Sequence, residues 1–330
     1  YVEENFIEFS EIDINLDLIE FLRNNNSIKR IKLATKDNSI NNITNFLNSY
    51  RFSLPRLLIY KQIKAGNIKL TANIYFDEQN IQDFKYEISG FVSNAELNLL
   101  NKNKLKNINF KFDKKDKIYN FENIKAKYQN INFQSNKISV VKVKEDFKIN
   151  GSINNQKGLI NPNIFSRIFN LNMDFLDTKK ILIESNNDFS FTINSKRKIE
   201  DLNFDSKIKY NQIYFNKNFI NLIYLSDGII EASYNKKNFL ADISGQYFFL
   251  DDKYNSDENK IKINIKKNQG KDINIKTYFK TKNTKINSKE LRNYVKFDKK
   301  FFKDQFILFN SDNIIDFSLS NKNKITNLNL

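Results

Sequence analysis

The side chains that most often carry out enzymatic chemistry are absent from this sequence. Its 330 residues include no His and no Cys, which excludes imidazole chemistry, thiolate nucleophiles and thiolate metal sites. Nucleophilic catalysis would then need a Ser–Lys pair or paired carboxylates. The sequence contains no G-x-S-x-G motif, no phosphate-cradling glycine loop and no recognisable metal-ligand spacing. We therefore expect a protein that is not an enzyme and that uses no cofactor and no metal.

One acidic segment has the oxygen ligands that a hard cation prefers. DDKYNSDEN, from Asp251 to Asn259, carries carboxylates at Asp251, Asp252, Asp257 and Glu258. It lacks the central glycine of a calcium-binding loop. We favour a solvated hairpin loop over a cation site here.

The net charge of +16 raises the question of nucleic-acid binding. Most of the basic residues are Lys, spread over the polar half of alternating segments, as at Lys207, Lys209, Lys262 and Lys266. Base readout favours Arg, and phosphate binders usually gather their charge into one patch. The pattern therefore indicates a solvated lysine-rich face, and nucleic acid is not an expected partner.

Alternation of apolar and polar residues is the dominant pattern of the chain. The segment IKINIKKNQGKDINIKTYF (Ile261 to Phe279) shows it twice, with a break around Gly270. This period predicts strands that have one apolar and one polar face, and the break has the length of a hairpin turn. Similar stretches of five to seven residues recur every ten to fifteen residues, which is too close for parallel crossovers. The abundant Asn and Lys dipeptides are predicted to form the turns, because Gly and Pro are scarce.

Few helices are expected. The predicted helices lie near 37–50, capped by Asp37 or Ser39, near 161–171 and near 289–297, with a helical turn at Asp17 to Leu22. The predicted fold is therefore mainly β, a long antiparallel meander sheet curled into an open apolar groove, with two or three short helices. We expect residues 1–330 to form one continuous β-groove segment.

The apolar side of such a sheet must be covered by a second sheet, by closure into a barrel, or by a ligand on an open surface. Two or three short helices can act only as plugs or caps. Aromatic runs at Tyr247, Phe248 and Phe249 and at Phe301 and Phe302 break the alternation. A sheet edge, a bulge or a helix-docking seam explains them better than a constriction or lip of the groove.

One stretch resembles a known family. In Lys64 to Phe112, the cadence I-x-G-x-V-x-x-A-x-L (Ile88 to Leu97) leads into L-x-N-I-N-F-x-F (Leu105 to Phe112), and Y-x-F-E-N-I follows at Tyr119 to Ile124. Together with the opening Ile28 to Leu47, these motifs resemble the AsmA-like proteins of Gram-negative envelopes, of the TamB and YhdP type. The resemblance covers most of the first 150 residues, and the remainder only in its rhythm.

The resemblance implies a repeating β-groove that conducts phospholipids between the inner and outer membranes. It also implies a periplasmic location, a tether to the inner membrane through an anchor outside this segment, and outer-membrane proteins as further candidate partners. The chain begins at Tyr1 and ends within a strand-like segment, so we expect a piece of a longer protein. The residues expected to line the groove are Ile88, Val92, Phe110, Phe112, Phe189, Phe191, Ile193, Phe204, Ile208, Phe239, Ile243, Ile261, Ile263, Ile265, Ile273, Ile275 and Phe279.

The alternative hypothesis is a structural or adhesive β-sandwich, or an assembly-type envelope protein, with no lipid ligand. An Ile or Phe that lines a groove has the same sequence signature as one that fills a sandwich core. Lipid bound to the purified chain would distinguish the two.

Overall fold

A computed structural model gives the fold of most of the chain. It describes residues 6–23, 28–50, 62–76, 84–98, 104–129, 131–161, 176–177, 181–216, 223–236, 238–249, 256, 258–268, 270–287, 306–320 and 325–329. The chain divides into two compact units. Unit 1 comprises Tyr1–Asn155 and Ser190–Glu200, and unit 2 comprises Gln156–Phe189 and Asp201–Leu330.

Among the described residues, the following helices and strands lie wholly within unit 1. They are β1 (Phe9–Leu16), α1 (Leu18–Leu22), β2 (Ile28–Thr35), β3 (Asn38–Ser39), α2 (Ile40–Tyr50), β4 (Ile63–Phe76), β5 (Phe84–Asn98), β6 (Lys104–Lys115), β7 (Ile118–Tyr128) and β8 (Ile131–Val143). Strands β9 (Asp146–Ile160) and β10 (Ile181–Ile193) contribute residues to both units.

Unit 2 continues the strand series. Its further strands are β11 (Ile199–Tyr214), β12 (Ile223–Asn235), β13 (Asn238–Phe249), β14 (Lys260–Asn268), β15 (Ile273–Asn287), β16 (Phe306–Leu319) and β17 (Ile325–Asn329). The first two residues of β11 belong to unit 1.

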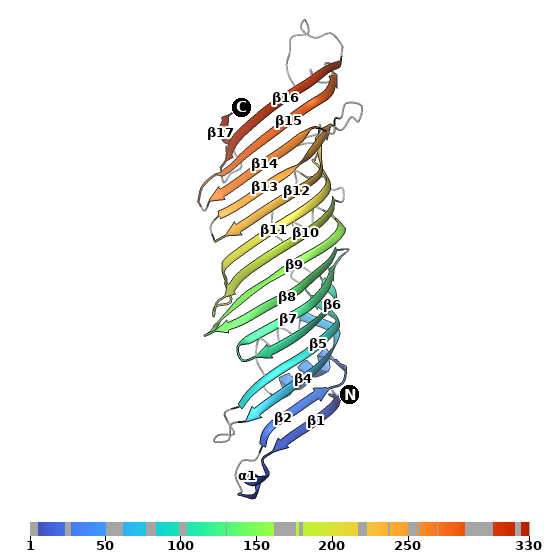
Figure 1. Cartoon of the computed structure of the whole chain (residues 1–330), viewed down its shortest axis with the longest axis vertical. Coiled ribbons are helices and arrows are strands. Elements are labelled where there is room, and N and C mark those ends of the chain that lie inside the picture. The colour runs from blue at the N-terminus through green and yellow to red at the C-terminus, as the bar shows by residue number, and fades with distance from the viewer. Residues whose placement is uncertain are drawn as a thin grey trace. The chain divides into compact units, whose positions relative to one another are not determined.

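Each strand pairs with its neighbour in the chain, and every ladder is antiparallel. In unit 1 the pairs run from β1–β2 through β2–β4 to β7–β8, and in unit 2 from β11–β12 to β16–β17. Figure 1 shows β12 to β16 side by side in chain order. The hairpin expected at Gly270 joins β14 to β15: Gly270 has φ +72° and the Lys271 N–H donates to the Asn268 carbonyl over 3.1 Å. The prediction of a mainly β antiparallel meander is confirmed.

Two predicted helical segments are present. Asp17 caps α1 by accepting a bond from the Ile19 N–H (2.9 Å), and the Ser39 hydroxyl accepts one from the Asn41 N–H (3.3 Å) at the start of α2. The helices expected near 161–171 and 289–297 fall outside the described residues, apart from Asn161, as do Phe301 and Phe302.

The strands are longer than the expected five to seven residues, and that prediction was wrong. Strand β5 alone has 15 residues and joins two alternating segments, Phe84 to Val92 and Ala95 to Leu97. Asn94 stands between them with φ +50°, and the β5–β6 register shifts between Val92 and Ala95. This is a β-bulge, in which an extra residue restores the alternation on the far side without ending the strand.

Helix α2 covers part of the sheet in unit 1. Its Ile40 packs with Val92 and Ala95 of β5 in a buried cluster, and the half-buried residues around it are Ile63, Ile68, Ile108, Phe110 and Phe112. Gly66 has φ +127°, and a Cβ there would lie 2.6 Å from the Ala95 Cα. Glycine at this position therefore permits the close approach of β4 to β5 beneath the helix.

Candidate functional site

The registers align apolar side chains in rows that cross the sheet. A row is a set of residues that face one another on successive strands. In unit 2, one row runs from β11 to β16 through Ile208, Ile230, Ile243, Ile263, Thr277 and Ile315. The next inward-facing row contains Ser206, Ala232, Ala241, Ile265, Ile275 and Phe317. We call the side that carries these rows the apolar face and the opposite side the polar face.

Unit 1 has an apolar face of the same construction. One row crosses β1, β2, β4 and β5 through Ile12, Leu33, Ala72 and Ile88. Another crosses β4 to β9 through Leu70, Gly90, Phe112, Phe121, Ile138 and Gly151. At β1 this face is accessible, because Ile12, Ile14 and Leu16 remain 45–60% exposed.

The seventeen residues expected to line a groove are all at least half-buried. Two of them are fully buried by protein: Val92 (5% exposed) lies under Ile40 of α2, and Ile261 (4%) lies opposite Phe279. The other fifteen keep partly accessible side chains. The apolar face is thus filled by protein at some positions and left partly accessible at others.

Tyr210 illustrates how the protein fills its own face. Its ring lies over two glycines, and a Cβ would come within 2.1 Å of the Tyr210 hydroxyl at Gly228 and within 2.6 Å at Gly245. The hydroxyl donates to the Ser244 carbonyl at 3.3 Å. Burial, together with the nearby Asp227 charge, raises the pKa of Tyr210 to about 12. Sequence reasoning missed this site, although glycines at an inward position on two adjacent strands could have indicated it.

A lysine interrupts the apolar rows of unit 1. Lys114 lies opposite Ile88 on β5 and Tyr119 on β7. Its ammonium sits 3.5 Å from the centroid of the Tyr86 ring and 6.0 Å from that of Tyr119. Aromatic faces attract cations, so these rings let a charge stand on the apolar face. The inward position of Lys114, two residues after Phe112, was the available sequence signal.

A buried polar cluster ties β13, β14 and β15 together in unit 2. Asn259 and Thr284 are both 0% exposed. The Asn259 side-chain oxygen accepts bonds from the Thr284 hydroxyl (2.9 Å) and from the Lys282 N–H (3.0 Å). Its amide nitrogen has no hydrogen-bond partner among the described residues. Nearby, the buried Tyr247 hydroxyl bonds Thr281.

The aromatic run at Tyr247, Phe248 and Phe249 lies in regular β13. It pairs with β12 without a register shift, and Phe249 ends the strand. Tyr247 faces Phe279 edge-on at 5.7 Å. Phe248 stacks on Tyr224, the residue directly opposite it on β12, with the ring centroids 5.5 Å apart. The bulge on this ladder is instead at Asp227, between Ser226 and Ile229, so of the three expected explanations for the aromatic run the bulge does not apply.

The described residues include only part of the acidic segment from Asp251 to Asn259. Asp251, Asp252 and Asp257 lie outside the described residues. Glu258 forms an ion pair of 2.5 Å with Lys282, whose hydrogen bond lowers the Glu258 pKa. Within the described part of the chain, no group of three or more acidic residues could hold a metal ion.

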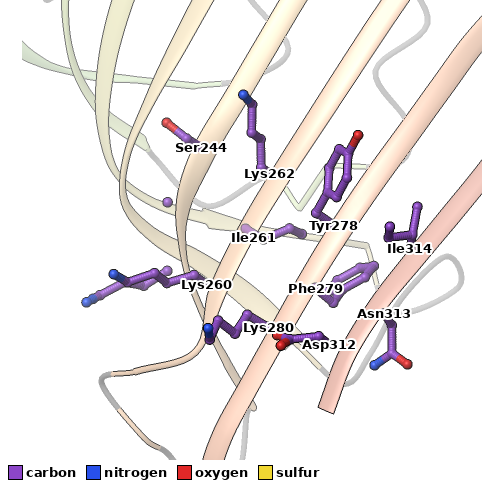
Figure 2. Close-up of a pocket in the computed structure, with 12 residues that line it drawn as sticks. Ser244, Lys260, Ile261, Lys262, Tyr278, Phe279, Lys280, Asp312, Asn313 and Ile314 are labelled. Atoms are coloured by element: carbon purple, nitrogen blue, oxygen red, sulfur yellow. The ribbon is translucent and has the colours of Figure 1, made fainter.

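The polar face of unit 2 is hollowed by a trough of about 650 Å³ across β13 to β16 (Figure 2). Two rows of side chains form its sides: Ser244, Lys262, Tyr278 and Ile314, and Gln246, Lys260, Lys280 and Asp312. The backbone between the rows, at Gly245, Ile261, Phe279 and Asn313, forms its floor. Figure 2 shows Ser244, Lys262 and Tyr278 pointing the same way from three strands. We call this site the basic trough.

The comparisons with known proteins give no family for this fold and these sites. No protein-family model, no curated protein and no solved structure matches the chain. Among the described residues, no helix combines the length and the apolar character that a membrane crossing requires.

Proposed function

We propose that this chain binds phospholipid acyl chains along its apolar face, as a segment of a lipid-transfer protein of the AsmA-like type. The observation that supports the proposal is the set of apolar rows whose members remain partly accessible, such as Ile243, Ile263 and Ile265. Soluble proteins seldom leave extended apolar surface without a partner or ligand.

The rows match the chemistry of an acyl chain. Each methylene transferred from water to an apolar surface contributes about 0.8 kcal/mol. Isoleucine recurs across neighbouring strands at Ile230, Ile243 and Ile263, so the gain is similar from one strand to the next. A bound chain can therefore move along the face without leaving a deep minimum. No catalytic step is part of this function.

The proposed location of this protein is the Gram-negative cell envelope. The resemblance in Lys64 to Phe112 supports a location in the periplasm, with a tether to the inner membrane through an anchor elsewhere in the protein. Phospholipids are then the working ligand, and outer-membrane proteins are candidate partners at the far end of the route.

The first experiment is organic extraction of the purified chain followed by lipid mass spectrometry, with native mass spectrometry for stoichiometry. We expect phospholipids with mixed acyl chains. A lipid-free, monodisperse and stable chain would contradict the proposal and favour a structural β-protein whose apolar faces cover each other.

A matched pair of substitutions on β15 locates the bound lipid. Ile275→Asp places a carboxylate on the apolar face, and Asn274→Asp makes the same charge change on the polar face. The control keeps an acceptor for the Ser318 hydroxyl, which donates to Asn274 over 2.9 Å. We expect lipid loss only in Ile275→Asp, with urea unfolding of the lipid-free chain changed by less than about 1 kcal/mol, because a lipid-facing position is not packed by protein.

The stability of the Ile275→Asp variant also distinguishes a lipid-facing position from a position in a protein core. In a closed sandwich, Ile275→Asp would bury an unpaired carboxylate and destabilise the fold by several kcal/mol. Ile263→Asp provides a second lipid-facing test on β14. Ile261→Asp is expected to destabilise under either hypothesis, because protein atoms cover all but 4% of Ile261.

A further inference from the structure

The basic trough brings three lysines of unit 2 together on the polar face. Lys260 of β14 and Lys280 of β15 lie directly opposite each other, and Lys262 follows two residues along the same face. Opposed side chains on antiparallel strands have Cβ atoms about 5 Å apart, and like charges at that spacing destabilise the pair. Among the described residues, no ion pair joins Lys260, Lys262 or Lys280 to a carboxylate.

At several other positions the sheet places a carboxylate opposite a lysine. Lys207 faces Glu231 and bonds it at 2.6 Å. The other opposed ion pairs are Lys115 with Glu87 (3.0 Å) and Lys137 with Glu122 (3.6 Å). Lys260 and Lys280 are instead opposed to each other, as Lys106 and Lys127 are in unit 1.

The acidic neighbours of the trough offset only part of its positive charge. Asp312 faces Lys280 from β16 without forming an ion pair, and Glu258, which pairs with Lys282, also interacts with the charge of Lys260. A fourth ammonium, that of Lys276, lies on the same face at 5.6 Å from the centroid of the Tyr278 ring, and Lys276 faces Asp316 on β16. The trough is consequently a local excess of positive charge.

A second trough on the same face has the opposite character. It crosses β10 to β13, and its charged residues are Asp188, Asp205, Lys207, Glu231 and Asp242. Lys207 is already paired with Glu231, so the remaining charge is acidic. Positive and negative charges on the polar face of unit 2 are thus concentrated at different sites. An even distribution of lysines over the face would not give this arrangement.

We propose that the basic trough binds a phosphate ester, with Lys260, Lys262 and Lys280 as the ligands of the phosphate. A phosphate monoester carries about −1.5 to −2 charges at neutral pH and accepts several hydrogen bonds, and a phosphodiester headgroup is also anionic, so either relieves the lysine repulsion directly. The Tyr278 ring and Ile314, which is 52% exposed, form an apolar wall beside it for the organic part of the ligand. The volume of about 650 Å³ lies within the roughly 300–1,000 Å³ usual for small-molecule sites.

The proposal does not rest on lipid binding at the apolar face. The trough opens on the polar face, so an acyl chain held on the apolar face cannot place its own headgroup there. The phosphate can come from a soluble ester or from the headgroups of a membrane surface. Both sources use the same three lysines, and the experiment distinguishes them.

The test measures binding of glycerol 3-phosphate to the purified chain by calorimetry, with glycerol as the uncharged reference. The trough variant is Lys260→Gln with Lys280→Gln. Its matched control is Lys106→Gln with Lys127→Gln, the directly opposed lysine pair of β6 and β7, which belongs to neither trough. Both double variants lose two charges, so a general effect of net charge weakens binding equally in both.

We expect saturable binding that weakens at least about tenfold in the trough variant and is unchanged in the control, because the trough variant loses two charge-assisted hydrogen bonds to the phosphate. In parallel, both variants are tested for flotation with phosphatidylcholine vesicles that contain or lack phosphatidylglycerol. Binding only to the anionic vesicles, lost only in the trough variant, supports the proposal with a membrane headgroup as the source. Equal losses in the two variants, or binding to neither probe, would overturn it.

Discussion

At the residue scale, two inward glycines create the space that Tyr210 fills. Gly228 and Gly245 lie beneath its ring on adjacent strands, and the hydroxyl reaches the Ser244 carbonyl. The aromatic ring thereby closes part of the apolar face without a second sheet or a helix.

Gly245→Ala is expected to destabilise unit 2 by about 1–3 kcal/mol, because its new Cβ meets the Tyr210 hydroxyl at 2.6 Å. In a Tyr210→Phe background the cost should fall by about 1 kcal/mol, since the clashing oxygen is gone. Urea unfolding of the double-mutant cycle measures this coupling. Gly270→Ala is the control: its φ of +72° makes alanine costly, but no atom lies near its Cβ, so its cost should not depend on Tyr210.

The Tyr210 hydroxyl also predicts a pH dependence. The folded chain holds this proton to a pKa of about 12, whereas an unfolded tyrosine releases it near pH 10. Its contribution is therefore fully present below pH 10 and is lost as the pH rises toward 12. The stability advantage of the wild type over Tyr210→Phe should shrink from pH 9 to pH 11 in urea titrations. A gap that widens over this range would contradict the assignment, and Tyr234→Phe, at an exposed tyrosine, is the reference variant.

At the element scale, asparagines keep the long strands in phase with the apolar face. Asn94, Asn123 and Asn283 adopt φ values of 50–53° inside strands, where glycine is more usual. At two of these bulges a neighbouring asparagine satisfies the freed backbone donor: Asn109 accepts from the Asn94 N–H (3.0 Å) and Asn310 from the Asn283 N–H (2.7 Å).

Asn94→Val should destabilise unit 1 by about 1–2 kcal/mol, because a β-branched residue fits the left-handed conformation poorly. Asn94→Gly should be close to neutral for the same conformational reason. The control is Asn132→Val, at an exposed extended position of β8 where valine is well tolerated. Chemical denaturation gives all three values, and equal costs at Asn94 and Asn132 would argue against the bulge as the cause.

At the scale of the whole molecule, the net charge of +16 opposes the compact state through self-repulsion. The ion pairs of the sheet join exposed side chains, as in Lys207–Glu231, and such pairs contribute little. Screening of the repulsion should therefore outweigh the weakening of the pairs when salt is added.

We accordingly expect the urea midpoint to rise between about 0.01 M and 0.2 M NaCl, over which the Debye length falls from about 30 Å to less than 10 Å. The dependence of unfolding free energy on urea should keep its slope, since the surface exposed on unfolding is unchanged. KCl at equal ionic strength should give the same shift. A midpoint that falls with salt would mean that the cross-strand ion pairs dominate.

Local periodicity was sufficient to predict much of the fold. Strict alternation over Ile261 to Phe279 predicted both strands of a hairpin and the side of each that is apolar, because the strand period of two is a property of the backbone alone. The cap of α2 at Ser39 was predictable for the same local reason. The resemblance to AsmA-like proteins and the lipid ligand remain predictions.

The features that distinguish the sites depended on tertiary structure. The opposition of Lys260 to Lys280, the placement of Tyr210 over Gly228 and Gly245, and the pairing of Asn94 with Asn109 join residues on different strands. A sequence pattern records which side a residue faces but not which residue faces it across the ladder, since register depends on turn lengths and on each bulge. The sequence by itself thus determined that this protein has an apolar and a polar face, and only the tertiary structure decided which side chains meet on them.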